Sequence, residues 1–338
     1  MIIVLRPEAS RADAEELLQR IEASGCKPLY MPGSERVVLG ALGDERVLAE
    51  LGVAAHPMVE EVKPILAPYK LVSREVHPHD TVVGIGSAAC GGEQFVVIGG
   101  GQVVGQAETL RPLATAIRHC GATALRGSGY SFRSAPYVTP QLDRAALDRL
   151  AEAARASGLP LVTEVRDLKD LDTVAGVADL LHVSARNMTN FGLLHALGSA
   201  GRPVLLERGP AARVEELLLS AEHLVAAGNE AVILCERGIR TFETATRATL
   251  DLNAVPWIKQ RSHLPVIVDP CQGTGVRSLV LPMAKAAAAC GADGLLVELD
   301  DPAATARADA PAALPVESFS QLMTELRAFL AASGRRLA

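Results

Sequence analysis

From Phe95 onward the chain repeats one pattern, in which a short apolar stretch is followed by polar residues and then by a longer segment with helical spacing. Short apolar stretches bounded by turn residues are typical of buried strands. Eight of them are predicted as strands: Phe95–Ile98, Ala122–Leu125, Pro160–Thr163, Leu180–Val183, Pro203–Leu206, Ala231–Leu234, Pro265–Val268 and Gly294–Val297. Amphipathic helices are predicted after them, among them Leu142–Ala156, Val214–Ala227 and Ser278–Cys290.

Strands that alternate with helices indicate a parallel sheet. Eight strand–helix units in about 240 residues fit a closed (β/α)8 barrel, so we expect an α/β fold, a TIM barrel, over residues 95–338. An open, doubly wound sheet is the alternative. That fold predicts a GxGxxG sequence at the first turn, and Gly99-Gly100-Gly101 lacks this spacing.

Residues 1–66 have a different pattern, with the predicted order βαββαβ of a ferredoxin-like α+β domain. The predicted elements are the strands Ile2–Leu5, Lys27–Met31, Arg36–Leu39 and Met58–Lys63 and the helices Arg11–Ser24 and Asp44–Leu51. This segment holds no cluster of catalytic residue types, which favours a regulatory or oligomerisation domain. Residues 67–94 are predicted as a linker and a hairpin, with Gly91-Gly92 at its turn or just beyond.

Composition excludes several classes of protein. The net charge of −6 gives no electrostatic reason to expect nucleic acid. No apolar run reaches the roughly 18 residues of a membrane span. The six cysteines are scattered without a CxxC pair, which indicates reduced thiols and a cytoplasmic enzyme rather than a disulfide framework.

Charged and amide residues follow the predicted barrel strands, and active sites of such barrels lie at the carboxyl ends of the strands. Arginines gathered there indicate an anionic small-molecule substrate, because guanidinium binds carboxylate or phosphate through paired hydrogen bonds. The alternative is that each arginine pairs with a carboxylate of the same rim. The residues concerned are Arg126, Arg133, Glu164, Arg186, Asn187, Glu207, Arg208, Glu236, Arg237, Asp269, Gln272 and Glu298.

Several motifs at these positions resemble those of the short, type I 3-deoxy-D-arabino-heptulosonate 7-phosphate (DAHP) synthases that carry an N-terminal ferredoxin-like domain. They are the runs Leu125-Arg126-Gly127, Arg133 to Tyr137, Ala185-Arg186-Asn187, Cys235 to Glu243, Ser262 to Pro265 with Asp269-Pro270, and the connection Pro68–Asp80. The resemblance implies a condensation of phosphoenolpyruvate (PEP) with erythrose 4-phosphate in the shikimate pathway. It also implies a divalent metal held by Cys, His, Glu and Asp, and a homotetramer or a homodimer.

This chain departs from the family at the metal ligands. The Cys and the His fall on Gln102 and Gln272, while Glu298 and Asp309 keep the two carboxylates. Two carboxylates with two neutral amides suit a weakly held hard cation rather than a transition metal. We therefore expect no cofactor, with weak divalent metal binding possible at Glu298 and Asp309.

The family's two PEP lysines are also replaced, by Ser131 and Glu207. Each unit of charge is worth roughly 3 kcal/mol at about 5 Å and an effective dielectric constant of about 20. The resemblance leaves Arg126, Arg186 and Arg237 as PEP-binding arginines, and Arg133 and Ser134 as binders of the aldose phosphate.

The candidate site residues therefore have more than one interpretation. Glu207 is either a general acid or base or one half of an ion pair with Arg126 or Arg186. Gln102 and Gln272 bind a substrate or fill the ligands' volume, and His263 is catalytic or supports its loop. Glu298 and Asp309 pair with Arg133 or carry acid–base chemistry, and Arg208, Ser131 and Asp269 complete the candidate substrate contacts.

From these departures we expect an enzyme on the DAHP synthase scaffold that has been repurposed for metal-independent lyase, aldol or proton-transfer chemistry on a shikimate-like carboxylate, in specialised metabolism. One alternative is a genuine DAHP synthase. The other is a catalytically inactive binding or regulatory subunit.

Overall fold

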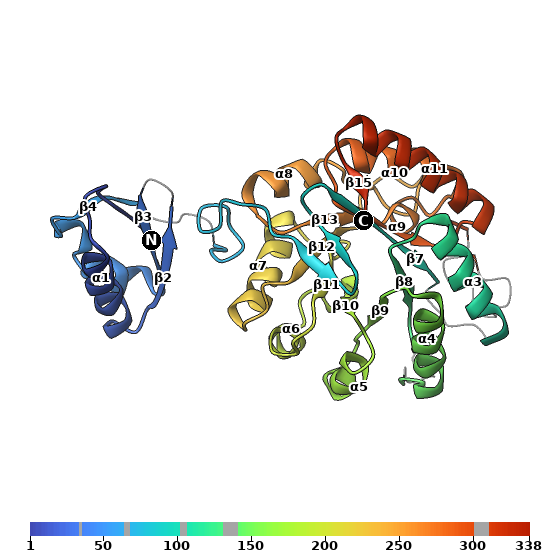
Figure 1. Ribbon diagram of the computed structural model, residues 1–338, viewed down its shortest axis with the longest axis horizontal. Coiled ribbons are helices and arrows are strands. Elements are labelled where there is room, and N and C mark those ends of the chain that lie inside the picture. The colour runs from blue at the N-terminus through green and yellow to red at the C-terminus, as the bar shows by residue number, and fades with distance from the viewer. Residues whose placement is uncertain (34–35, 64–67, 102–106, 131–140, 301–310) are drawn as a thin grey trace. The chain divides into compact units, whose positions relative to one another are not determined.

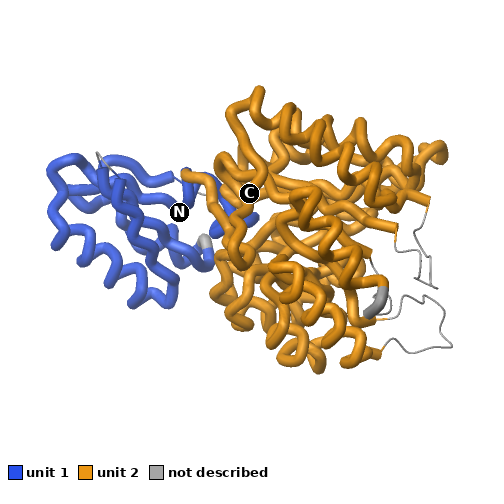
Figure 2. The backbone as a smooth tube through the Cα atoms, turned by 45° about the vertical axis from the view of Figure 1, so that its right-hand side comes forward, with its two compact units in different colours: residues 1–78 blue, residues 79–338 orange. Residues whose placement is uncertain are grey.

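The computed structural model describes residues 1–33, 36–63, 68–101, 107–130, 141–300 and 311–338. It divides the chain into two compact units, unit 1 from Met1 to Pro78 and unit 2 from His79 to Ala338 (Figure 2). Gln102, Ser131, Arg133, Ser134 and Asp309 lie outside the described residues, so their predicted roles stay predictions.

Unit 1 has the ferredoxin-like topology that the sequence predicts. Its sheet has the order β2-β3-β1-β4, and its paired strands are antiparallel. Helix α1 begins after Ser10, whose side chain and that of Asp13 form a capping box, and it buries Ala14, Leu17 and Ile21 against the sheet. The elements are β1 (Ile2–Leu5), α1 (Arg11–Ala23), β2 (Lys27–Pro32), β3 (Val37–Leu42), α2 (Glu45–Glu50) and β4 (Val59–Lys63).

Unit 2 is a closed parallel barrel, which confirms the predicted fold and excludes the open sheet. Strands β7 to β14 pair in sequence order, and β14 returns to β7 with Gly294 opposite Val96. The strands are β7 (Gln94–Gly100), β8 (Ala124–Gly127), β9 (Leu161–Glu164), β10 (Leu180–Val183), β11 (Val204–Glu207), β12 (Val232–Glu236), β13 (Val266–Val268) and β14 (Gly294–Glu298).

Helices surround the barrel strands (Figure 1). They are α3 (Ala107–Cys120), α4 (Arg144–Ser157), α5 (Leu171–Ala175), α6 (Phe191–Gly198), α7 (Val214–Ala226), α8 (Ala254–Arg261), α9 (Pro270–Thr274), α10 (Arg277–Ala289) and α11 (Val316–Ala332). A last short strand, β15 (Arg336–Leu337), pairs with the beginning of β7.

The strand boundaries differ from the predicted ones for a physical reason. Pro160, Pro203 and Pro265 were expected to begin strands, but β9, β11 and β13 each begin one residue later. Proline has no backbone N–H to donate to a neighbouring strand. The hairpin consists of β5 (Val83–Ile85) and β6 (Ala88–Cys90), so Gly91-Gly92 lies just beyond it and the turn is at Gly86-Ser87.

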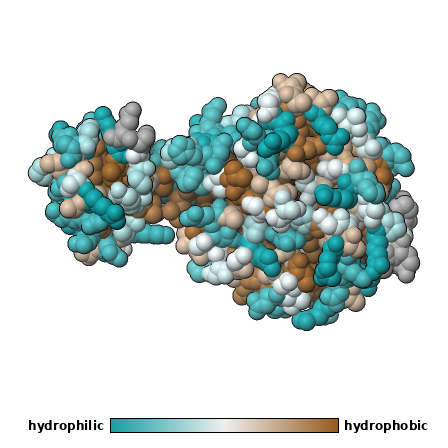
Figure 3. Space-filling model, viewed as in Figure 1, coloured by the Kyte–Doolittle hydropathy of each residue, from teal (hydrophilic) through white to brown (hydrophobic). Residues whose placement is uncertain are grey.

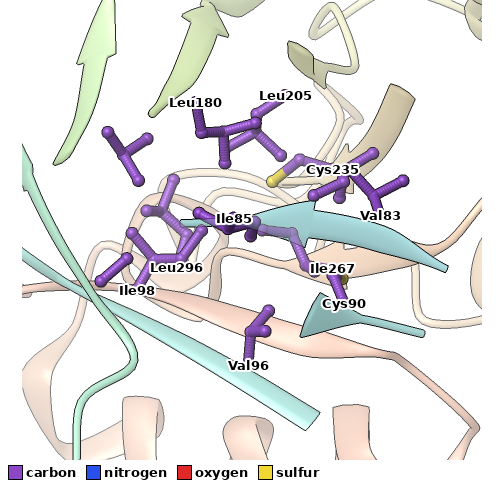
Figure 4. Close-up of a cluster of buried hydrophobic side chains, with 13 residues drawn as sticks. Val83, Ile85, Cys90, Val96, Ile98, Leu180, Leu205, Cys235, Ile267 and Leu296 are labelled. Carbon is purple, nitrogen blue, oxygen red and sulfur yellow. The ribbon is translucent and has the colours of Figure 1, made fainter. Parts of the chain in front are cut away.

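The hairpin closes the amino-terminal end of the barrel. Val83, Ile85 and Cys90 are buried with the inward side chains of the barrel strands, among them Leu180 and Leu205 (Figure 4). A side chain added at Gly86 would meet Pro160, the residue before β9, which places the hairpin at the strands' amino ends. Because this end is filled by apolar side chains, an opening to the barrel interior is left at the carboxyl ends.

Two observations bear on a possible contact with a membrane. On the visible face of unit 2, hydrophobic residues form small patches between hydrophilic ones (Figure 3). Within the described ranges, no helix combines the length and the apolar character that crossing a bilayer requires.

Candidate active site

A ring of charged residues lies one layer above the apolar barrel interior. Side chains two residues apart on a strand point to the same side, so each inward apolar residue is followed, two positions on, by an inward tip residue. Leu180 is followed in this way by His182, and Leu205 by Glu207. The inward-facing titratable residues at the strand tips are Arg126, Glu164, His182, Glu207, Arg237, Asp269 and Glu298.

Above this ring lies a cavity of about 550 Å³. Its polar lining is dominated by six arginines, which face the two carboxylates Glu164 and Glu207 and the amide of Gln272. The arginines are Arg126, Arg166, Arg186, Arg237, Arg240 and Arg247. The structure therefore brings together Arg126, Arg186 and Arg237 as the sequence predicts, and the excess of positive charge suits an anion.

Arg126 is the most deeply placed of these arginines. It is 7% exposed, and its Nη1 atom is itself buried and has no hydrogen-bond partner among the described residues. Burial opposes its charge, but the carboxylates of Glu207, Asp269, Glu298 and Glu164 together raise its pKa above the ordinary arginine value. A buried guanidinium that lines a cavity and keeps its charge is suited to bind an anionic ligand.

Its local backbone requires a glycine on the neighbouring strand. Gly100, which ends β7, has a φ of +147°, and a Cβ built there would lie 2.0 Å from the carbonyl oxygen of Arg126. The close approach of β7 and β8 at this point therefore depends on the absence of a side chain.

Glu207 is held by three groups of the protein. Its Oε1 lies 2.8 Å from Nε2 of His182, its Oε2 accepts a hydrogen bond of 3.0 Å from the backbone N–H of Ala185, and Arg237 Nε lies 3.6 Å away. Burial alone would raise its pKa, but the charges of His182, Arg237 and Arg126 hold that pKa well below its usual range. Such a carboxylate accepts a proton poorly, which favours an ion pair over a general base. The recorded partners are His182 and Arg237, however, and not the predicted Arg126 or Arg186.

Gln272 has an orientation that its neighbours determine. Its Oε1 accepts hydrogen bonds from Arg237 Nη2 at 2.7 Å and from Arg247 Nη1 at 3.1 Å, and its Nε2 donates to Glu298 Oε2 at 3.3 Å. The reverse orientation would set amide donors against two guanidinium groups. The backbone is fixed as well, because Asp269 caps α9 by accepting the N–H of Gln272 at 2.8 Å.

Two further carboxylates lie beneath the cavity and titrate at unusually high pH. Burial, partly offset by Arg126, raises the pKa of Asp269 to about 6 and that of Glu298 to about 7. Asp269 is fully buried, and its Oδ2 has no hydrogen-bond partner. Near neutral pH both groups are therefore partly protonated.

Of the residues at the family's metal position the structure describes Gln272 and Glu298, and the surroundings of Gln272 do not suit a transition metal. The oxygen of Gln272 faces two guanidinium groups whose nitrogens are at most about 6 Å apart, and each would repel a cation placed there. Nowhere in the described ranges do three His, Cys, Asp or Glu side chains form a group that could hold a metal ion. Cys271 beside it is fully buried, where burial raises its pKa, and its Sγ accepts the N–H of Glu298.

Two predicted site residues lie elsewhere. His263 precedes β13 at the amino-terminal end of the barrel, where its Nδ1 lies 2.6 Å from Oγ1 of Thr81. It is not among the residues that line the cavity, which favours its structural interpretation. Arg208 is buried and donates to Glu236 and Asp251, each at 2.8 Å, and it is not among the residues that line the cavity. Its predicted contact with substrate was wrong, because those two carboxylates occupy its guanidinium.

Sequence reasoning missed His182, Arg166, Arg240 and Arg247. The alternation along the predicted strand Leu180–Val183 could have identified His182 as inward-facing. Arg166 pairs with Glu164 at 2.8 Å and lies over the ring of Tyr130, a contact between loops that no sequence pattern signals. Arg247 lies within the long connection after β12, so its position depends on how that connection folds.

Comparison with known proteins supports the family resemblance that the sequence motifs indicate. The sequence profile of the DAHP synthetase I family matches residues 76–331, and that of the DAHP synthase ferredoxin-like domain matches residues 1–67. The phospho-2-dehydro-3-deoxyheptonate aldolase of Thermotoga maritima is 42% identical over 99% of both chains. A 2-dehydro-3-deoxyphosphooctonate aldolase of Acidithiobacillus ferrooxidans is 30% identical over 60% of this chain and 73% of its own.

Solved structures give the same result. The crystal structure of the Thermotoga maritima phospho-2-dehydro-3-deoxyheptonate aldolase (DAHP synthase) has a TM-score of 0.78 and 41% identity, and covers 100% of this chain and 99% of that one. A truncated form of the Thermotoga maritima 3-deoxy-D-arabino-heptulosonate 7-phosphate synthase has a TM-score of 0.74 and 42% identity, over 80% of this chain and 99% of that one.

Proposed function

The chain belongs to the DAHP synthetase I family, and we propose that it is a DAHP synthase, which joins PEP to erythrose 4-phosphate. It is a DAHP synthase-like enzyme, and its likeness to the Thermotoga maritima enzyme extends over the whole chain. This proposal takes up the alternative that the sequence left open, in preference to a repurposed enzyme or an inactive subunit.

The observation that carries the proposal is the cavity lined by six arginines, among them the buried Arg126. Arg126, Arg186 and Arg237 would bind the phosphate and carboxylate groups of PEP, since paired guanidinium donors match both groups. The cavity volume of about 550 Å³ lies in the usual range for small-molecule sites.

A second candidate function is favoured by Glu207 and Gln272. A fixed carboxylate at the position of a PEP lysine disfavours a trianion, and the environment of Gln272 does not suit a transition metal. The second candidate is therefore metal-independent lyase, aldol or proton-transfer chemistry on a less highly charged, shikimate-like carboxylate. Only the first proposal, a DAHP synthase, includes a weak divalent metal site at Glu298 and Asp309.

The test is consumption of PEP by the purified protein with erythrose 4-phosphate, measured after chelation and again with a panel of divalent metals. A DAHP synthase releases one phosphate for each PEP consumed. Arg126→Met should abolish the turnover, while Arg155→Gln, an exposed arginine near the end of α4, should leave it unchanged. Absence of turnover under every condition would retire the first proposal and lead to a screen of shikimate-like carboxylates.

The assembly of the protein is part of the proposal as well. We infer a homotetramer or a homodimer in which unit 1 serves regulation or oligomerisation. Sedimentation of the full chain tests this, and a monomer at micromolar concentration would contradict it.

A further inference from the structure

We propose that Gln272 positions Arg237 and Arg247 as a phosphate-binding subsite that works without a metal ion. The subsite consists of two guanidinium groups that donate hydrogen bonds to one amide oxygen. This oxygen lies where the family resemblance puts a ligand of a divalent cation. This inference rests on the proposed function for the identity of the natural ligand, a phosphate ester. The binding of phosphate to the subsite can nevertheless be measured without turnover.

The first argument is the convergence of like charges. Arg237 Nη2 and Arg247 Nη1 donate to the same Gln272 oxygen at 2.7 and 3.1 Å. A neutral amide satisfies one hydrogen bond of each guanidinium but cancels neither charge, and Glu207, 3.6 Å from Nε of Arg237, offsets only part of the combined positive charge. Burial and the charge of Arg237 both lower the pKa of Arg247, which shows that the two groups are close enough to repel each other.

The second argument is that the subsite opens into the cavity. Arg237, Arg247 and Gln272 all line it, and the buried Arg126 lines it too. A group bound by the two arginines is thus within the same cavity as a third guanidinium. Two neighbouring positive charges suit a phosphate dianion better than a carboxylate with a single charge.

The third argument is that Gln272 is held rigidly enough to act as a positioning residue. Its N–H is fixed by Asp269 and its amide nitrogen donates to Glu298, while the side chain is 4% exposed. The oxygen is therefore presented to the arginines in one orientation, and the two guanidinium groups lose little freedom when an anion binds.

The experiment is a calorimetric titration of the full-length protein, freed of metals by chelation, with inorganic phosphate. The wild type should bind phosphate, more tightly than it binds pyruvate, and added Mn²⁺ should not strengthen the binding. Arg247→Gln should weaken binding roughly tenfold or more, the effect of losing one charge-assisted hydrogen bond, and should reduce the salt dependence. Arg247→Lys, which keeps the charge, should recover part of the affinity.

Two changes at Gln272 separate positioning from charge. Gln272→Met keeps both arginines but removes their shared acceptor, and Gln272→Glu keeps the acceptor but adds a negative charge. Each should weaken phosphate binding, while Arg155→Gln should not. Circular dichroism melting identifies any variant that has lost its fold. Arg247→Gln then provides the decisive measurement, because Arg247 is exposed.

Three results would overturn the proposal: no phosphate binding by the wild type, binding that requires Mn²⁺, or unchanged affinity in Arg247→Gln. Tighter binding of pyruvate than of phosphate would overturn the choice of phosphate. A protein that binds phosphate in this way but does not consume PEP would contradict the proposed function alone, so the two failures are distinguishable.

Discussion

Replacing Glu207 by glutamine should make the protein less stable and, at the same time, a better binder of PEP. Glu207 is 3% exposed and interacts with His182, the N–H of Ala185 and Arg237. Removing one charge of a buried pair costs about 3–5 kcal/mol, because the other charge is left uncompensated. Glutamine retains an acceptor for Ala185, so we expect the lower end of this range.

For a unit of this size, about 3 kcal/mol corresponds to a fall in melting temperature of about 6–12 °C. The effect on binding has the opposite sign. The cavity loses a negative charge, and a charge about 5 Å from a ligand is worth up to about 3 kcal/mol at an effective dielectric constant of about 20. Solvent reduces this figure, so tenfold tighter binding of PEP is expected.

The assay is a thermal melt followed by scanning calorimetry and a PEP titration at constant ionic strength. Glu325→Gln is the control, since its partly exposed pair with Lys285 should be worth less than about 1 kcal/mol. An unchanged melting temperature would refute the argument that Glu207 is a fixed structural charge. Loss of turnover with unchanged PEP affinity would identify it as an acid–base catalyst instead.

Three further predictions concern the buried groups around the site. Glu298 and Asp269 bind more protons in the folded protein than in the unfolded chain between about pH 4 and pH 7, since the pKa of Glu298 is raised to about 7 and that of Asp269 to about 6. Their contribution to the free energy of unfolding should therefore fall as pH rises through this window. Denaturant titrations should show that Glu298→Gln removes about 3 kcal/mol of this fall, and an unchanged slope would contradict the assigned pKa. Gly100→Ala should lower the melting temperature sharply, because its Cβ would lie 2.0 Å from a backbone oxygen at a φ of +147°; a melting temperature equal to that of the wild type would show that the strands can separate there. His263→Ala should lose about 1–3 kcal/mol of stability through its bond to Thr81 but keep turnover, and a loss of turnover without loss of stability would return it to the active site.

The sequence was sufficient to predict the barrel and most of the rim, because both depend on local periodicity. Apolar stretches and prolines mark the strands, and the two-residue repeat of a strand places Glu207 directly above Leu205 in the barrel interior. The partners of Glu207 were harder to predict. His182 belongs to the neighbouring strand, and identifying it requires the register of β10 against β11, which sets Val183 opposite Leu206.

The hydrogen-bond partners of Gln272 could not be predicted from the sequence for a different reason. Arg247 comes 25 residues earlier in the chain and approaches Gln272 through a long connection without regular structure. Hydrogen-bond chemistry then decides which way the amide faces. Only with both arginines in place does Gln272 become the centre of an anion subsite rather than a weak metal ligand.

The two departures from the family meet at one side chain. Glu207 lies 3.6 Å from Nε of Arg237, and Gln272 accepts from Nη2 of the same guanidinium at 2.7 Å. A lysine at position 207 would set a positive charge against Arg237, and a metal ion at position 272 would do the same from the other side. The present pair instead surrounds Arg237 with an anion and a neutral acceptor. Reverting Glu207 or Gln272 alone therefore places a cation beside Arg237, which the other residue still holds in place. The two positions have to be altered together.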